Sequence, residues 1–257
     1  MNRIQFIFLD VGNVIFTDDV AVAYYSWRLF QYIRQEAIHN LSFEHFLEER
    51  ESLALGDMAD SASASERVGE NYLGKEGIKV FRQLYRADAM PHFDKLTPLL
   101  PGIQQLLECL QTKASLGLIA NQPAECADSL KRRGLWQFFA VHGLSDIVGM
   151  YKPDPEFFLW ACRQAQQAPT DCLMIGDRWD NDILAARGIG MIPVWLRWQN
   201  IHDKGISPTN NYEHMYFESV NRVYEKRRSW PPGHTSSDHV VHSVAELATL
   251  LAKFVHP

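Results

Sequence analysis

Six short segments of the chain are almost entirely apolar, and longer stretches with helical spacing separate them. Strands of a parallel sheet that is covered on both faces have this pattern, because neither side of the strand meets water. Strands that alternate with helices predict an open α/β sheet joined by right-handed crossovers. The apolar segments are IQFIFLD at 4–10, LGLIAN at 116–121, 139–142, CLMIGD at 172–177, 193–196 and 239–241.

A block of different character follows the first predicted strand. It contains no strand-like run, and its apolar residues recur at helical spacing, as at Leu29 and Ile33. We therefore predict a helical insert over residues 17–95. The remaining parts, 1–16 and 96–257, are predicted to form one α/β core.

One region of the predicted core has no clear pattern. Residues 198–237 are rich in Asn, Pro, Tyr and Trp, and we predict an irregular insert with a single helix near 216–226. His234, His239 and His242 lie close together near its end. Their spacing fits no zinc motif, so we expect no metal site there.

Composition excludes several classes of protein. Of the 257 residues, 46% are hydrophobic and 22% are charged, which is typical of a globular chain and not of a disordered, collagen-like or coiled-coil one. The formal net charge of -6 provides no basic field for nucleic acid or for an anionic membrane surface, so we expect neither as a partner. The sequence does not decide between a monomer and a homodimer.

The first apolar run is too short to direct the chain to a membrane. It extends only from Ile4 to Leu9 before Asp10 interrupts it, whereas a signal-peptide core or a spanning helix needs a longer run. The four cysteines include no CxxC pair, and Cys109 and Cys162 fall on the apolar faces of predicted helices. We therefore expect reduced, mostly buried cysteines in a cytoplasmic protein.

Polar side chains stand at the ends of three predicted strands. Asp10, Asn121 and Asp177 each end an apolar segment, and Asp182 lies at the start of a helix predicted over 183–187. Because the carboxyl ends of neighbouring parallel strands meet at one crevice, we expect these side chains to lie together. Clustered carboxylates repel one another unless a cation lies among them, and a hard divalent ion such as Mg²⁺ suits them.

A lysine complements this acidic cluster. In GMYKPDPEFF, Lys152 directly precedes Pro153, which keeps it outside the helix that Asp154 is predicted to cap. A lysine held in a loop at the crevice can neutralise both a nucleophilic carboxylate and an incoming phosphate. Carboxylate, lysine and Mg²⁺ together are typical of phosphoryl transfer through an aspartyl-phosphate intermediate.

Four ordered segments of the chain resemble the motifs of a known family. DVGNV, AN, KPDP and GDRWDND, the last followed by ILAARGIGM, are similar to the motifs of the haloacid dehalogenase (HAD) superfamily of phosphatases and related hydrolases. The resemblance covers most of the chain. It implies a Rossmann-like parallel-sheet core with a helical cap after the first motif, which corresponds to 17–95. It also implies a Mg²⁺-dependent hydrolase, here a phosphatase acting on a small phosphorylated metabolite.

The resemblance also implies roles for the acidic residues. Asp10 would be the nucleophile. Asp10, the main-chain carbonyl of Gly12 and Asp177 would bind Mg²⁺, and Asp182 would support the metal from close by. The phosphate would be bound by Lys152, which also serves catalysis, and by Asn121.

Two positions depart from the family pattern. Gly12 stands where the family's phosphatases usually have a second aspartate, the general acid and base. Ala120 stands where the family has a Ser or Thr that contacts the phosphate. A missing proton donor costs on the order of 10²- to 10⁴-fold in rate. We therefore predict a slow or specialised phosphohydrolase that favours aryl, acyl or anomeric sugar phosphates, whose leaving groups need little protonation.

Two alternatives remain from the sequence. Gly12 and Ala120 are compatible with a catalytically weak HAD-like protein that binds or regulates. The other alternative is a 2-haloacid dehalogenase-type hydrolase, in which the aspartate attacks carbon and no metal is needed. Retention of Asp177 and Asp182 disfavours this dehalogenase, because a metal-free site has no use for the acidic pair.

Overall fold

The computed structural model divides the chain into two compact units, and it describes residues 4–36, 39–56, 61–227 and 239–255. The core unit comprises Met1–Thr17, Leu99–Trp198 and Pro231–Pro257. The helical unit comprises Asp18–Pro98 and Gln199–Trp230.

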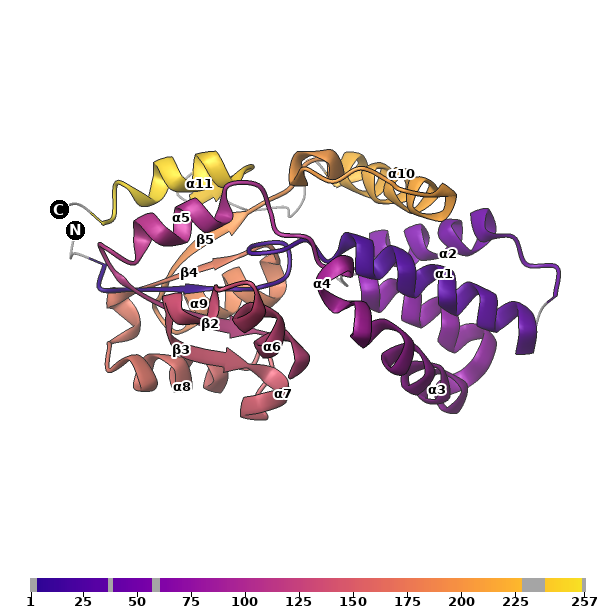
Figure 1. The fold of residues 1–257 in the computed structure, drawn as a ribbon, viewed down its shortest axis with the longest axis horizontal. Helices are drawn as coiled ribbons and strands as arrows, with labels where there is room; N and C mark the ends of the chain where they lie inside the picture. The colour runs from indigo at the N-terminus through magenta and orange to yellow at the C-terminus, as the bar shows by residue number, and fades with distance from the viewer. Residues whose placement is uncertain (1–3, 37–38, 57–60, 228–238, 256–257) are drawn as a thin grey trace. The chain divides into compact units, whose positions relative to one another are not determined.

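A six-stranded sheet forms the centre of the core unit, with strand order β3-β2-β1-β4-β5-β6 (Figure 1). Every neighbouring pair is parallel. The predicted α/β fold is therefore confirmed, and each predicted apolar segment coincides with one strand to within two residues at either end. The strands are β1 (Phe6–Leu9), β2 (Ser115–Ala120), β3 (Phe139–Leu144), β4 (Cys172–Gly176), β5 (Ile192–Leu196) and β6 (His239–Val241).

Helices cover both faces of this sheet, which explains why its strands lack polar alternation. On one face, α8 and α9 pack against alternate strand residues such as Phe8, Ile119 and Met174. On the opposite face lie α5 and α11 (Figure 1). The helices of the core unit are α5 (Ile103–Leu110), α6 (Glu125–Arg132), α7 (Ser145–Val148), α8 (Pro155–Ala165), α9 (Ala185–Gly188) and α11 (Val244–Leu251).

The helical unit buries a core of its own. Its helices bring together large apolar side chains such as Leu29, Phe46, Phe81 and Phe217. A kink interrupts its longest helix at Gly74, where φ is 68°. The helices are α1 (Asp19–Glu36), α2 (Phe43–Gly56), α3 (Ser61–Ala89), α4 (Phe93–Leu96) and α10 (Asn211–Lys226).

The segment 199–230 belongs with the helical unit, whereas the sequence pattern predicts that 198–237 is an irregular insert in the core. The reason is the apolar face of α10, where Tyr216, Phe217 and Val220 are buried in the core of the helical unit. Residues 228–238, which include His234, lie outside the described part of the chain.

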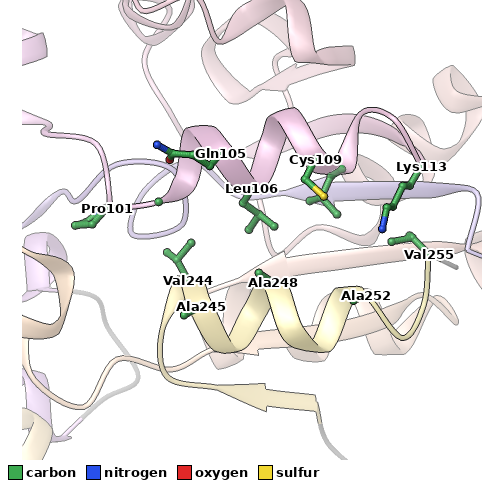
Figure 2. Close-up of a pocket in the computed structure, with 12 residues that line it drawn as sticks. Pro101, Gln105, Leu106, Cys109, Lys113, Val244, Ala245, Ala248, Ala252 and Val255 are labelled. Carbon is green, nitrogen blue, oxygen red and sulfur yellow. The ribbon is translucent and has the colours of Figure 1, made fainter. Parts of the chain in front are cut away.

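One of the four cysteines is exposed. Burial is confirmed for Cys126, Cys162 and Cys172, but the expectation for Cys109 is wrong. On α5, Cys109 lies about 60° around the helix from Leu106, at the edge of the apolar stripe. It lines a groove of about 320 Å³ between α5 and α11 (Figure 2).

Across the described ranges, the structure contains no helix that is long and apolar enough to cross a membrane.

Candidate active site

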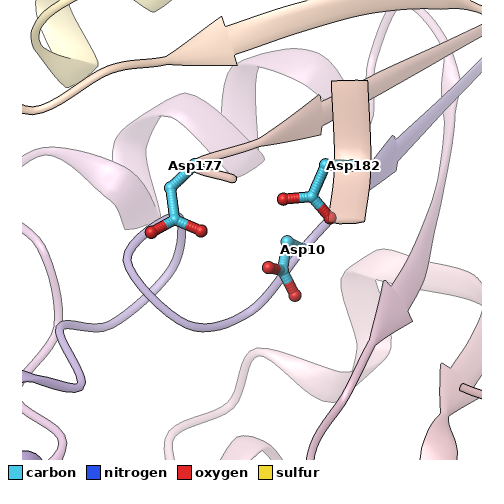
Figure 3. A group of neighbouring side chains, drawn as sticks. All are labelled: Asp10, Asp177 and Asp182. Carbon is cyan, nitrogen blue, oxygen red and sulfur yellow. The ribbon is translucent and has the colours of Figure 1, made fainter. Parts of the chain in front are cut away.

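The structure brings Asp10, Asp177 and Asp182 together at the carboxyl ends of two adjacent strands (Figure 3). One carboxylate oxygen of each lies within 4.8 Å of the others. Asp10 follows β1 and Asp177 follows β4, and these strands are in parallel register with Leu9 opposite Ile175. The sheet continues one step further, since Asp10 N donates to the carbonyl of Ile175 at 2.9 Å. Parallel pairing of neighbouring strands therefore places the first two carboxylates side by side.

Lys152 lies between two of these carboxylates. Its Nζ is 2.8 Å from Asp10 Oδ1 and 2.6 Å from Asp182 Oδ1, and the residue is only 5% exposed. Burial lowers the pKa of Lys152, but the charges of Asp10 and Asp182 outweigh burial and hold that pKa above its ordinary value. The ammonium is therefore charged at neutral pH.

Asp182 is fully buried, and both of its carboxylate oxygens accept hydrogen bonds. Oδ1 accepts from Lys152 Nζ, and Oδ2 accepts from the main-chain N–H of Arg178 at 2.9 Å. Burial raises the pKa of Asp182 to about 6; Lys152 lowers this pKa, and the neighbouring Asp10 raises it. Because both oxygens already have partners, Asp182 is suited to support a metal site.

A π-helical turn, Trp179–Leu184, carries Asp182 back against β4. The sequence pattern predicts a helix over 183–187 with Asp182 at its start, but α9 begins only at Ala185. Gly176 at the end of β4 makes the close approach possible, since a Cβ there would lie 2.3 Å from the Asp182 side chain.

A tight turn follows Asp10. The carbonyl of Val11 accepts hydrogen bonds from the N–H groups of Val14, Ile15 and Phe16, and the Val11 N–H donates to Asp10 Oδ1 at 2.8 Å. Gly12 lies buried inside this turn and pairs with Phe16. The turn therefore fixes the orientation of the Asp10 carboxylate.

Asn121 lies at the same edge of the sheet, after β2. Its Nδ2 donates to the carbonyl of Lys152 at 2.9 Å, and its Oδ1 accepts from the Lys152 N–H at 2.8 Å. The preceding residue, Ala120, is fully buried and has no hydroxyl to offer. Asn121 thus bonds the main chain of Lys152, the other residue that is predicted to bind the phosphate.

Sequence reasoning missed two buried tryptophans that support the site. Trp195 Nε1 donates to the carbonyl of Asp177 at 2.9 Å, and Trp198 Nε1 donates to the carbonyl of Asn13 at 2.8 Å. Trp195 lies in β5 and Trp198 follows it, and this strand carries none of the recognised motifs. The only signal was the position of two indole donors at the end of a strand in the same sheet.

Residues 4–190 match the family model of the haloacid dehalogenase-like hydrolases. The chain belongs to this family. The resemblance seen in the sequence is therefore confirmed.

Sequence relatives of this HAD-like hydrolase carry names of phosphatases. Pyrimidine 5'-nucleotidase YjjG of Escherichia coli is 34% identical over 44% of this chain and 51% of the relative. Phosphoglycolate phosphatase of Vibrio vulnificus is 33% identical over 48% of this chain and 58% of the relative. Glyceraldehyde 3-phosphate phosphatase of Methanopyrus kandleri is 30% identical over 49% of this chain and 54% of the relative. The chain therefore spans about half the length of the curated relatives it matches.

Solved structures share the fold over nearly the whole chain. A HAD phosphatase from Thermococcus onnurineus superposes with a TM-score of 0.61 at 18% identity, covering 96% of this chain and 97% of that one. The putative HAD-hydrolase YfnB from Bacillus subtilis gives a TM-score of 0.62 at 18% identity, covering 97% and 99%. At this identity the likeness concerns the fold alone.

The donor set of this HAD-like site fits a hard divalent cation. Asp10, Asp177 and Asp182 offer only carboxylate oxygens, the ligands that Mg²⁺ prefers, and they converge within one small volume. Such a cation would offset the mutual repulsion of the three carboxylates, two of which also pair with Lys152. Asp10 and Asp177 would hold the ion, and Asp182 would support it.

Proposed function

We propose that this HAD-like hydrolase is a Mg²⁺-dependent phosphatase that acts on a small phosphorylated metabolite through an aspartyl-phosphate on Asp10. The observation that carries the proposal is the buried Lys152 ammonium between Asp10 and Asp182, with Asp177 beside them. A buried positive charge at the nucleophile favours an anionic substrate, and the acidic cluster favours a metal.

Asp10 is proposed as the nucleophile. Val11 N–H and Lys152 hold Oδ1, which leaves Oδ2 to attack phosphorus. The new bond joins Oδ2 to phosphorus, and the bond to the leaving oxygen breaks. Water then attacks the aspartyl-phosphate, which releases inorganic phosphate and restores the carboxylate. When bound, Mg²⁺ would be held by the carboxylates of Asp10 and Asp177 and by the Gly12 carbonyl, and it would offset negative charge on the phosphate and on the two carboxylates.

The names of the sequence relatives support this reaction class. Pyrimidine 5'-nucleotidase, phosphoglycolate phosphatase and glyceraldehyde 3-phosphate phosphatase each denote an enzyme of a small phosphate monoester. These names differ in the organic part of the substrate and share the phosphate. Hydrolysis of a phosphate ester is therefore the reaction that we propose for this chain.

Hydrolysis of p-nitrophenyl phosphate tests the proposal. We expect turnover with Mg²⁺ that EDTA abolishes and that Asp10→Asn reduces by about 10³-fold or more, because the amide is not a nucleophile. Asp128→Asn, which neutralises an exposed carboxylate on α6, is the matched control and should retain wild-type turnover. Turnover that persists in EDTA, or in Asp10→Asn, would contradict the proposal.

Gly12 makes a prediction about the leaving group. Without an acid at this position, the rate for an alkyl phosphate should be lower than the rate for an aryl phosphate by a factor on the order of 10² or more. Gly12→Asp should raise turnover of the alkyl ester more than that of the aryl ester. Equal wild-type rates for both esters would show that no acid is missing.

Gly12 and Ala120 also favour a second candidate, a binding or regulatory HAD-like protein of low activity. Both positions lack the side-chain group that the family's phosphatases use. This candidate predicts that phosphate and Mg²⁺ bind while no variant turns over any phosphate ester. Mg²⁺-dependent turnover that is lost in Asp10→Asn eliminates it.

A further inference from the structure

The loop that carries Lys152 is held by the two residues that follow β2. Both polar groups of the Lys152 main chain bond the Asn121 amide, at 2.9 and 2.8 Å. The carbonyl of the next residue, Gln122, accepts from Ser145 Oγ at 3.2 Å and from Asp146 N–H at 3.4 Å. Asn121 and Gln122 thus bond both ends of the segment 145–152.

A turn surrounds Lys152, since the Asp154 N–H donates to the Tyr151 carbonyl at 3.0 Å, and Asn121 bonds the main-chain groups of Lys152 itself. The following residue, Pro153, has no N–H, and α8 begins only at Pro155. Lysine has a long, flexible side chain, so its Nζ reaches a defined point only when its main chain is fixed. The paired bonds to Asn121 fix that main chain while Asp10 and Asp182 bind the ammonium.

We propose that Asn121 is a positioning residue that acts through Lys152 and not through a contact with the phosphate. The inference rests on the proposed function and deepens it. The Asn121 amide already uses one donor and its acceptor on the Lys152 main chain. Hydrogen-bond partners that orient metal ligands typically change affinity or activity by about 10- to 100-fold when they are removed, and we expect a loss of the same order for Asn121.

A double-mutant cycle separates positioning from phosphate contact. Asn121→Ala in the wild-type background should lower kcat/KM for p-nitrophenyl phosphate by about 10- to 100-fold. In a Lys152→Met background the same change should have less than about a 2-fold effect, because the group that Asn121 positions is gone. If Asn121 contacts phosphate directly, the two losses multiply, and that result would overturn the inference.

Inorganic phosphate provides the same cycle where turnover of Lys152→Met is too slow to follow. Its dissociation constant should rise in Asn121→Ala only when Lys152 is present. Asn221→Ala is the control, since it removes a comparable side-chain bond to the main-chain N–H of Ile201 in the helical unit. That variant should leave kcat/KM and phosphate binding unchanged, which separates a local effect from general loss of stability.

The crystal structure of Asn121→Ala distinguishes failure of the inference from failure of the proposed function. We expect Lys152 Nζ to leave the position between Asp10 and Asp182 while the sheet is unchanged. An unmoved ammonium would overturn the inference. Wild-type protein without phosphatase turnover would overturn the proposed function, and the inference would then be judged on phosphate binding and on this structure.

Discussion

At the scale of single residues, the site depends on hydrogen bonds to main-chain carbonyls as well as on its charges. Trp195→Phe tests this for Asp177, because it keeps the ring packed on Trp179, 5.2 Å away, and removes the indole donor. We expect the Mg²⁺ concentration for half-maximal activity to rise about 10-fold, since supporting groups tune metal affinity on that scale. Titration of activity with Mg²⁺ measures it.

The matched control for this substitution is Trp160→Phe. Trp160 lies on α8 and packs against the same apolar cluster as Phe157, 6.0 Å away between ring centroids. The Trp160→Phe substitution should leave the Mg²⁺ dependence at the wild-type value. A Trp195→Phe variant with unchanged Mg²⁺ dependence would show that the Asp177 carbonyl holds its position without the indole.

Thiol reactivity gives a second test at this scale. Cys109 is exposed beside the groove between α5 and α11, whereas the other three cysteines are buried (Figure 2). A thiol reagent should therefore modify one cysteine per folded chain and four after unfolding, because burial blocks access. Cys109→Ser should abolish the reaction of the folded protein. More than one fast-reacting thiol would contradict the burial of the other three.

Charged site residues could be predicted from the sequence, but their supports could not. Asp10 and Asp177 each end an apolar strand, so the topology of a parallel sheet alone predicts that they meet. The bonds from Trp195 and Trp198 to main-chain carbonyls leave no pattern in the sequence, because any residue supplies a carbonyl. The pairing of Asn121 with the Lys152 main chain was missed for the same reason.

At the scale of elements, one glycine permits the π-helical turn to pack on β4. An alanine Cβ at Gly176 would lie 2.3 Å from Asp182, so Gly176→Ala must displace the turn or the strand. We expect the free energy of unfolding to fall by about 1–3 kcal/mol, the usual cost of overpacking. Denaturant unfolding measures this loss. Mg²⁺-dependent activity should fall with it, because Asp182 moves.

Gly188→Ala is the control at this scale. Gly188 ends α9, and an added Cβ there would meet nothing within 4 Å. Alanine has the higher helix propensity, so stability should be unchanged or slightly increased. Equal stability of the Gly176 and Gly188 variants would contradict the close packing of Asp182 on β4.

The strands were the most predictable elements, and the π-helical turn was the least. An apolar run without alternation has few interpretations once helices flank it, so each strand was located from the sequence. The helix expected from residue 183 instead begins as a π-helical turn at Trp179. There Ile183 N–H reaches the Arg178 carbonyl at 3.3 Å, while the Asp182 side chain bonds the Arg178 N–H. That tertiary contact sets the turn and has no sequence signature.

At the scale of the whole molecule, the chain builds its helical unit from two distant segments. Residues 199–230 follow a strand of the core unit, so their position in the sequence favoured the core. Amphipathic spacing identifies the apolar face of α10, but it does not say which apolar surface covers that face. Packing in three dimensions decides which unit covers the apolar face of α10. The sequence alone therefore does not define the domain boundaries.

A buried ion pair joins these two segments and allows their association to be tested. Lys204, which is 1% exposed, pairs with Asp19 in the first turn of α1. Lys204→Met leaves the Asp19 charge buried without this partner and should cost about 3–5 kcal/mol, whereas adding Asp19→Asn should recover much of the loss. Hydrogen exchange should show weaker protection of α1 and α10 in the single variant and unchanged protection of the β-sheet. Equal loss of protection in both units would mean that the chain unfolds as one cooperative body. Unchanged protection of α10 would mean that its apolar face, without the ion pair, holds 199–230 in the helical unit.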